Sequence, residues 1–451
     1  MEVIVKIGQF LLSLSILVVL HELGHFTFAK LFKTRVEKFY MFFDPGFSLF
    51  KFKKGETEYG IGWLPLGGYV KISGMIDESM DKEQMKLPPE PYEFRSKPAW
   101  QRLLIMVGGV LVNFVLAFVI YVAVLYTWGE QYLPAENVKY GVVCDSLAES
   151  IGLQDGDKIV ALDNQKVKKF NDIVPDILLN SPKSIQFIRN NEQLSIDIPS
   201  SFVPALLEES SKGFSLSPVF DIRYPYSAVS IGKVLKESPA SEAGILKGDK
   251  IVSIDSVGFS YYDQFQTFLQ SKKSQSILVQ LNRDGKSEQV QLTVGDDGKI
   301  GFYPQIESGL FEYETLEYTF VESIPAGFNK GIDKLGSYLK QFKLIFSSET
   351  KAYKSIGGFI TIGNIFPGVW NWEAFWNLTA FLSIILAIMN ILPIPALDGG
   401  HVMFLMYEII TGRKPGDKFM EYAQITGMVL LFGLLLFANG NDVVKWISNM
   451  K

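Results

Sequence analysis

The residues with the clearest chemical potential are two of the chain's three histidines. His21 and His25 flank Glu22 in the segment His-Glu-Leu-Gly-His, inside an apolar run that otherwise predicts a membrane helix. Side chains at i and i+4 share one helix face, so both imidazoles can bind one metal ion, while the glutamate takes a proton from a water that the metal polarises. Because a charged group at bilayer depth costs about 3 kcal/mol, the motif predicts a functional site.

A catalytic zinc site usually takes three protein ligands, and Asp398 is the candidate for the third. It is the only acidic residue within the interruption of the third apolar segment, at 392–400. Pro393, Pro395 and the pair Gly399-Gly400 break helix geometry around it. A broken helix can aim a carboxylate inward, so we expect Asp398 to complete the metal site.

Three further polar residues lie in or beside the apolar segments. Asn390 either hydrogen-bonds a substrate backbone or developing oxyanion, or satisfies backbone groups that the two prolines free. Asn113 is expected to pack against a neighbouring helix or to support the metal site from behind, rather than to act in catalysis. His401 follows Asp398 by three residues and is a weaker candidate for a ligand.

The composition indicates a membrane enzyme with a water-soluble insertion. The chain is 48% hydrophobic and 20% charged, yet its mean hydropathy of +0.17 is too low for a protein that is membrane throughout. A net charge of −5 leaves no basic footprint for nucleic acid, so no nucleic-acid partner is expected. The single cysteine, Cys144, excludes a disulfide within the chain.

Four apolar segments are long enough to be membrane spans. They run over residues 3–32, 103–128, 375–410 with an interruption at 392–400, and 425–437, the last extending toward Trp446. Lys and Arg residues follow the first span, precede the second, and lie between the third and fourth. Such residues favour the cytoplasmic side, so both termini and the long segment between spans two and three are expected outside. The histidines then lie toward the cytoplasmic face.

The external segment contains an internal repeat. Gly-Leu-Gln-Asp-Gly-Asp-Lys-Ile-Val at 152–160 recurs as Gly-Ile-Leu-Lys-Gly-Asp-Lys-Ile-Val at 244–252. Upstream, Gly141 and Gly232 occupy similar positions, each before a small-residue helix start. The pattern resembles tandem PDZ domains, which bind extended peptides at a strand edge, with a glycine-containing loop taking a chain-end carboxylate. Gly141 and Gly232 are the candidates for these loops, although the repeat does not establish that either copy binds peptide.

The stretch between the first two spans is too apolar for an ordinary loop. Residues 56–72 predict two short strands around a Pro-Leu-Gly-Gly turn that includes Gly67 and Gly68 and leads into Tyr69. An open strand edge can line a cavity inside a membrane protein, where it would hold a substrate backbone in extended form. The alternative is a hairpin that only packs against the first helix.

Together these motifs resemble the site-2 proteases, a family of intramembrane zinc metalloproteases, over nearly the whole chain. The resemblance rests on the His-Glu-Leu-Gly-His segment, the run from Asn390 to Gly399, and residues 59–70, which look like the family's membrane-re-entrant hairpin. It implies that His21, His25 and Asp398 bind one zinc ion and that Glu22 is the general base. The family's usual Gly-Pro pair in the second span is Gly108-Gly109 here, which puts the local backbone in doubt.

The resemblance also implies an architecture, which is a multi-pass α-helical membrane protein with a re-entrant β-hairpin and two inserted PDZ-like α+β domains. The expected parts are an N-terminal membrane part (1–128, hairpin at about 50–75), PDZ-like domains (129–220 and 221–308), amphipathic interfacial helices (309–374) and a C-terminal membrane part (375–451). The interfacial helices would either help to gate substrate entry or simply anchor the chain.

By the same resemblance, this is a bacterial inner-membrane enzyme that contacts lipid. Its substrates would be single-span membrane proteins, such as anti-sigma factors already cut by a site-1 protease, and remnant signal peptides. The competing interpretation is a non-catalytic membrane scaffold whose PDZ pair captures peptide ends. Intact Glu22 and Asp398 argue against it, and the inverted repeats common in transporters, which would favour a proton relay, are not evident.

Overall fold

The computed structural model describes residues 2–75, 87–211, 219–345, 347, 350 and 352–448. The chain divides into two compact units. One comprises residues 1–130, 210–215 and 317–451, and is called the membrane unit below because it holds the long apolar helices. The other comprises residues 131–209 and 216–316, and is called the inserted unit.

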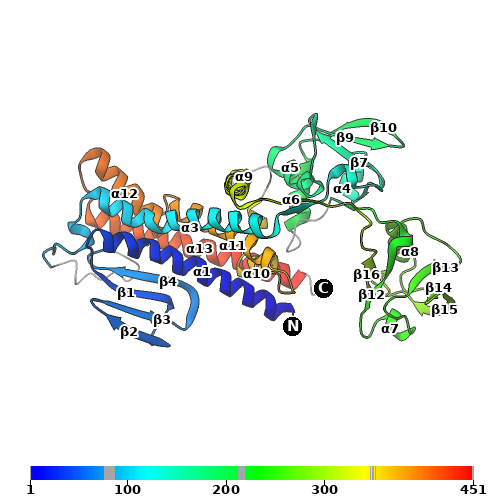
Figure 1. Ribbon diagram of the computed structural model, residues 1–451, viewed down its shortest axis with the longest axis horizontal. Helices are drawn as coiled ribbons and strands as arrows, with labels where there is room; N and C mark the ends of the chain where they lie inside the picture. The colour runs from blue at the N-terminus through cyan, green and yellow to red at the C-terminus, as the bar shows by residue number, and fades with distance from the viewer. Residues whose placement is uncertain are drawn as a thin grey trace. The chain divides into compact units, whose positions relative to one another are not determined.

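Four helices of the membrane unit are long and apolar enough to cross a membrane. They are α1 (Glu2–Leu31), α3 (Ala99–Trp128), α11 (Trp372–Ile391) and α13 (Asp417–Ser448). Helices α1, α3 and α11 pack against one another, and Figure 1 shows the start of α1 and the end of α13 at the same end of this unit. Helix α3 is central because it packs against α1, α11, α12 (Asp398–Thr411) and α9 (Phe320–Ile345). The chain is therefore built as a multi-pass membrane protein.

The third apolar segment is broken where the prolines predict. Helix α11 ends at Ile391, and α12 begins at Asp398. Between them Ala396 takes a positive φ of 82°, a conformation that L residues rarely adopt. A side chain on Gly399 would lie 2.0 Å from the backbone oxygen of Leu392, so only glycine allows α12 to start this close to the end of α11. With 14 residues, α12 is too short to span a bilayer.

A four-stranded sheet packs beside α1. Its strands are β1 (Val36–Phe43), β2 (Phe50–Lys54), β3 (Thr57–Ile61) and β4 (Leu64–Ile72), in the order β2-β3-β1-β4. The expected hairpin over 56–72 is therefore wrong, because β3 and β4 are separated by β1 and the Pro-Leu-Gly-Gly residues lie inside β4. Strand β1 pairs parallel to β3 and antiparallel to β4. Strand β4 forms an edge of the sheet and contacts α1.

The described residues of the inserted unit form two large hydrophobic cores and a small third cluster of Leu133, Val138 and Phe311. One is built from residues between Ala135 and Phe220, and the other from residues between Tyr226 and Ile300. Its helices and strands are β5 (Glu130–Tyr132), β6 (Val142–Cys144), α4 (Ser146–Ser150), β7 (Lys158–Leu162), β8 (Gln165–Lys166), α5 (Ile173–Asn180), β9 (Ser184–Arg189), β10 (Glu192–Asp197), α6 (Phe202–Ser211), β11 (Phe220–Ile222), β12 (Val229–Val234), α7 (Pro239–Glu242), β13 (Lys250–Ile254), α8 (Tyr262–Ser271), β14 (Ser276–Arg283), β15 (Lys286–Thr293), β16 (Phe302–Ile306) and β17 (Glu314–Leu316).

The Gly-Asp-Lys segments make the same contacts in both halves of this unit. Asp157 accepts hydrogen bonds from both Nε and Nη2 of Arg189, and Asp249 accepts the same pair from Arg283. Each arginine also donates to the carbonyl of the glycine that begins its segment, Gly152 or Gly244. The matched aspartates thus tie each segment to a strand that follows more than thirty residues later.

Of the segment expected to form interfacial helices, residues 320–345 form α9 and residues 359–365 form α10 (Phe359–Ile365). Helix α9 packs against α3 through small residues spaced four apart, Ser323, Gly327 and Gly331. A side chain on Gly327 would lie 2.6 Å from the backbone nitrogen of Val122. Close backbone approach of this kind is typical of helices that associate within membranes.

Candidate active site

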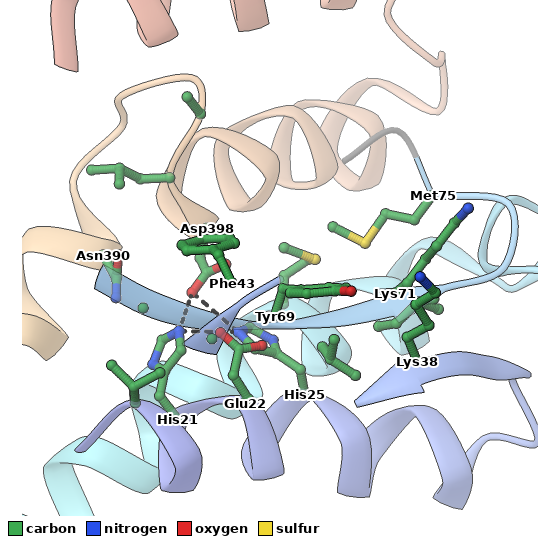
Figure 2. Close-up of a pocket in the computed structure, with 18 of the residues that line it drawn as sticks. His21, Glu22, His25, Lys38, Phe43, Tyr69, Lys71, Met75, Asn390 and Asp398 are labelled. Carbon is green, nitrogen blue, oxygen red and sulfur yellow. Dashed lines mark hydrogen bonds and ion pairs between the residues drawn. The ribbon is translucent and has the colours of Figure 1, made fainter. Parts of the chain in front are cut away.

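A pocket of about 860 Å³ lies in the membrane unit, between the sheet and the helices. Residues of α1, β1, β4, α11 and α12 line it. Figure 2 shows His21, Glu22, His25 and Asp398 close together on its wall, with Lys38 and Lys71 farther along. Residues from opposite ends of the chain therefore meet at one cavity.

Two imidazoles and one carboxylate converge within this pocket. The Oδ2 atom of Asp398 lies 3.1 Å from Nε2 of His21 and 3.3 Å from Nε2 of His25, and the two Nε2 atoms are 3.2 Å apart. In the described part of the chain, these are the residues grouped closely enough to hold a metal ion. A zinc ion with bonds of about 2.0–2.1 Å and tetrahedral angles needs ligand atoms about 3.3 Å apart. The triangle fits that requirement.

The position and surroundings of the Asp398 carboxylate suit it to bind a cation. It stands at the first residue of α12, aimed at the histidines by the break between α11 and α12. Its Oδ2 atom is buried, and apart from the two imidazole Nε2 atoms no donor among the described residues approaches it. A buried oxygen without a donor is costly, and a metal ion removes that cost.

Helix α3 contacts the far nitrogen of each imidazole. The Nδ1 atom of His25 lies 2.9 Å from the carbonyl oxygen of Ile105. The Nδ1 atom of His21 lies 3.1 Å from the side-chain nitrogen of Asn113, which is fully buried. Contacts of this kind fix the orientation and tautomer of metal-binding histidines.

Glu22 is half-buried and projects into the same pocket. Its carboxylate accepts a hydrogen bond from the backbone N–H of Val70 in β4. The edge strand therefore directs the backbone N–H of Val70 toward the candidate base. Glu22 and β4 therefore belong to the same site.

Comparison with known proteins agrees with this geometry. The family model described as Peptidase family M50 matches residues 9–434. The chain belongs to peptidase family M50. This confirms the resemblance to the site-2 proteases that the sequence motifs carry.

Relatives of this M50 peptidase match over almost their full length. The "Regulator of sigma E protease" of Haemophilus influenzae is 27% identical over 469 residues, which cover 98% of this chain and 99% of the relative. A "Putative zinc metalloprotease" of Borreliella burgdorferi is 29% identical over 447 residues, with 96% of each chain covered. A protein with the same description from Rickettsia conorii is 27% identical over 443 residues, with 97% and 98% covered.

The weaker candidates of this M50 peptidase divide between the two units. Asn390, Gly67, Gly68 and Tyr69 line the pocket, and His401 lines it too but lies outside the three-residue cluster. The two candidate loop glycines belong to the inserted unit.

The expected loop position is wrong for Gly232, and the backbone carbonyl of Gly141 is already hydrogen-bonded. Gly232 lies inside β12, at a register shift in its pairing with β16, and not in a loop. Gly141 precedes β6 with a positive φ of 73°, and its carbonyl accepts a hydrogen bond from the backbone N–H of Arg223. That carbonyl is thus already engaged within the chain.

Around the expected Tyr69, the pocket of the M50 peptidase contains further residues that were not identified from the sequence. The hydroxyl of Tyr69 donates to Asp44 at 2.9 Å, and the Tyr69 ring stacks on Tyr40 and Phe43. Lys38 and Asp44 also line the cavity. Except for Tyr69, these residues belong to β1 or follow it directly, and the sequence predicts no strand there. The short run of aromatic and apolar residues over 39–43 is the signal that could have revealed it.

Proposed function

We propose that this M50 peptidase is a zinc-dependent intramembrane endopeptidase that hydrolyses peptide bonds in or near single transmembrane segments. The observation that carries the proposal is the triangle of His21, His25 and Asp398 beside a strand edge, in a unit built from membrane-spanning helices. Relatives named as zinc metalloproteases support zinc as the cofactor, one ion per chain.

The proposed chemistry assigns a task to each pocket residue. When bound, zinc supplies a Lewis acid that acidifies a water molecule and polarises the scissile carbonyl. His21, His25 and Asp398 hold the ion. Glu22 takes the proton of the attacking water and delivers it to the leaving amide nitrogen. Asn390 donates from its side-chain amide to the oxyanion that develops on the carbonyl.

Substrate positioning falls to β4 in this proposal. An amide within a helix is hydrogen-bonded and shielded, so a transmembrane substrate must unwind locally before cleavage. Among the described strands β4 is an edge strand, and its residues Gly67, Gly68 and Tyr69 line the pocket. The unwound segment pairs with this edge as an added strand, which satisfies its backbone groups and holds the scissile bond beside Glu22.

The inserted unit consists, in this proposal, of two PDZ-like domains outside a bacterial inner membrane, with the active site toward the cytoplasm. The matched contacts of Asp157 and Asp249 and the two separate cores support the tandem arrangement. The pair excludes substrates with large external domains. Cleavage then follows a first cut by a site-1 protease, and the substrate class includes anti-sigma factors and remnant signal peptides. The relative named for regulation of sigma E supports this class.

The test compares purified wild type with Glu22→Gln, each loaded with the same amount of zinc, on a short single-span substrate in detergent. Glutamine keeps the shape of Glu22 and leaves the three ligands in place, but it cannot accept the proton. We expect cleavage by wild type, loss of at least about 100-fold in the variant, and loss in wild type after chelation. Equal cleavage by both proteins would refute the proposed base.

A second comparison separates the enzyme from a peptide-binding scaffold. If wild type binds zinc but cleaves none of several single-span substrates, with and without large external domains, the protease assignment fails. Cleavage that becomes faster when the external domain is removed would support the size-filter role of the inserted unit.

A further inference from the structure

Asn113 combines three observations that its position in an apolar helix does not explain. It is 0% exposed, and its side-chain amide lies 3.1 Å from Nδ1 of His21. Its own backbone oxygen accepts a hydrogen bond from Ser383 of α11 at 2.8 Å, beyond the ordinary helix pattern. Its side-chain oxygen is buried and has no hydrogen-bond partner. Because this amide is buried and fixed beside a candidate metal ligand, we expect it to have a function at the metal site.

The tautomer of His25 is fixed by the group behind it. The Ile105 carbonyl oxygen can only accept, so Nδ1 of His25 carries the proton. In a neutral imidazole the other nitrogen then has a free lone pair. Nε2 of His25 is the atom that faces Asp398 and His21, so this tautomer is the one that can bind a metal.

His21 faces the same centre with the same atom, Nε2. It therefore needs the same tautomer, with the proton on Nδ1 and an acceptor opposite. The neighbour there is Asn113, whose amide offers a donor at one end and an acceptor at the other, in nearly the same shape. A half-turn of the amide replaces the nitrogen with the oxygen that now lacks a partner.

We propose that Asn113 is a positioning residue for the metal, which accepts a hydrogen bond from Nδ1–H of His21 through its side-chain oxygen. The inference rests on the proposed function, because it assumes that His21 binds zinc through Nε2. Helix α3 then fixes both histidines in one tautomer, through Ile105 for His25 and through Asn113 for His21. The two contacts lie eight residues apart, on one face of the helix.

The decisive experiment measures zinc affinity in the full-length protein by competition with a chelator of known affinity. Asn113→Asp keeps an acceptor at both ends of the side chain, whereas Asn113→Leu and Asn113→Ala remove it. We expect Asn113→Asp to keep the dissociation constant within about threefold of wild type, because a carboxylate behind the histidine serves the same role. The Leu and Ala variants should bind zinc about 10–100-fold more weakly.

Thr379→Val is the matched control. Thr379 is also 0% exposed in a spanning helix, and its hydroxyl donates to Ser13 of α1 at 2.9 Å, but it makes no contact with the histidines. Its loss should leave zinc affinity unchanged. Melting temperatures in detergent, measured for every variant, show whether a change in affinity merely follows unfolding.

The outcomes separate this inference from the proposed function. If Asn113→Asp weakens binding as much as the Leu and Ala variants, Asn113 acts as a donor and the inference is wrong. If all three bind zinc like wild type, Asn113 does not position His21. A wild type that binds no zinc would overturn the proposed function and the inference with it. The electronic spectrum of the cobalt-substituted protein, unchanged in Asn113→Asp and altered in Asn113→Leu, provides an independent readout.

Discussion

Gly109 and His25 lie so close that the glycine can carry no side chain. A Cβ atom on Gly109 would lie 2.5 Å from Nε2 of His25, and 2.7 Å from Cε1 of His21. We therefore expect Gly109→Ala to push both imidazoles out of the triangle with Asp398. Zinc binding should weaken by at least about tenfold, and proteolysis should fall with it.

The matched control for this prediction is Gly433→Ala, in the spanning helix α13. A side chain there would meet nothing within 4 Å. Zinc titration of both variants, with thermal melting as a check on folding, measures the difference. A Gly109→Ala protein that binds zinc as tightly as wild type would show that α3 can move away from α1 without cost.

The metal cluster could be predicted from the sequence because each part had a local signal. His21 and His25 share a helix face by spacing alone, and Asp398 is the only acid at the interruption that the prolines make in the third apolar segment. The contribution of α3 could not be predicted in the same way. The role of Gly109 depends on which helix packs against α1, and a single sequence does not specify that pairing.

For the sheet, by contrast, local sequence signals led to a wrong prediction of which strands pair. Residues 57–61 and 64–72 do form strands, and the error lay in pairing them with each other. Strand β1 carries Lys38 and follows the positive charges that end the first span, and no strand is predicted over its residues. The insertion of β1 between β3 and β4 depends on contacts between residues far apart in the sequence, and turn residues do not predict such contacts.

Strand addition to β4 predicts a period of two in the substrate. In an added strand, alternate residues direct their N–H groups toward β4 and the others direct them away. Proline has no N–H, so proline substitutions at successive positions beside the scissile bond should slow cleavage strongly at alternate positions only. Alanine at the same positions is the control, and initial rates are the measurement. Loss that follows no alternation would argue against pairing with β4.

The Asp249–Arg283 pair should stabilise the second half of the inserted unit above acidic pH. The hydrogen bonds from Arg283 hold the pKa of Asp249 below its ordinary value of 3.8. Because the folded-state pKa is the lower one, this stabilisation is complete above about pH 4 and is lost as the pH falls through the folded pKa. Asp249→Asn should therefore cost about 1.5–3 kcal/mol at pH 7 and little in strong acid.

Hydrogen exchange across β13, which follows Asp249 directly, measures this effect in the intact protein. The variant should exchange faster than wild type at pH 7, with the difference shrinking below pH 4. Asp284→Asn, at an exposed neighbour of the same arginine, is the control and should leave exchange unchanged. Equal exchange in Asp249→Asn and wild type at pH 7 would contradict the prediction.

Cys144 should resist alkylation in the folded protein. Burial raises the pKa of its thiol to about 12, and the charge of Asp155 adds to the shift. At pH 8 only about one molecule in ten thousand then carries the reactive thiolate. Because the chain has one cysteine, intact-mass measurement after iodoacetamide treatment reports this site alone. We expect modification at least about 100-fold slower than in the urea-unfolded chain, and similar rates in the two states would refute the shift.

The four spanning helices differ greatly in how much of their most apolar stretch is buried inside the protein. Within its most apolar stretch, α3 is 44% buried, whereas α13 is 11% buried. Yet α13 touches the segment that carries Asp398, because Gln424 accepts a hydrogen bond from the backbone N–H of Ala396 and Gly427 packs against Pro395. The helix with the least buried apolar stretch therefore supports the turn that places a metal ligand. Any displacement of α13 would remove a hydrogen bond and a packing contact from the segment that aims Asp398 at the histidines.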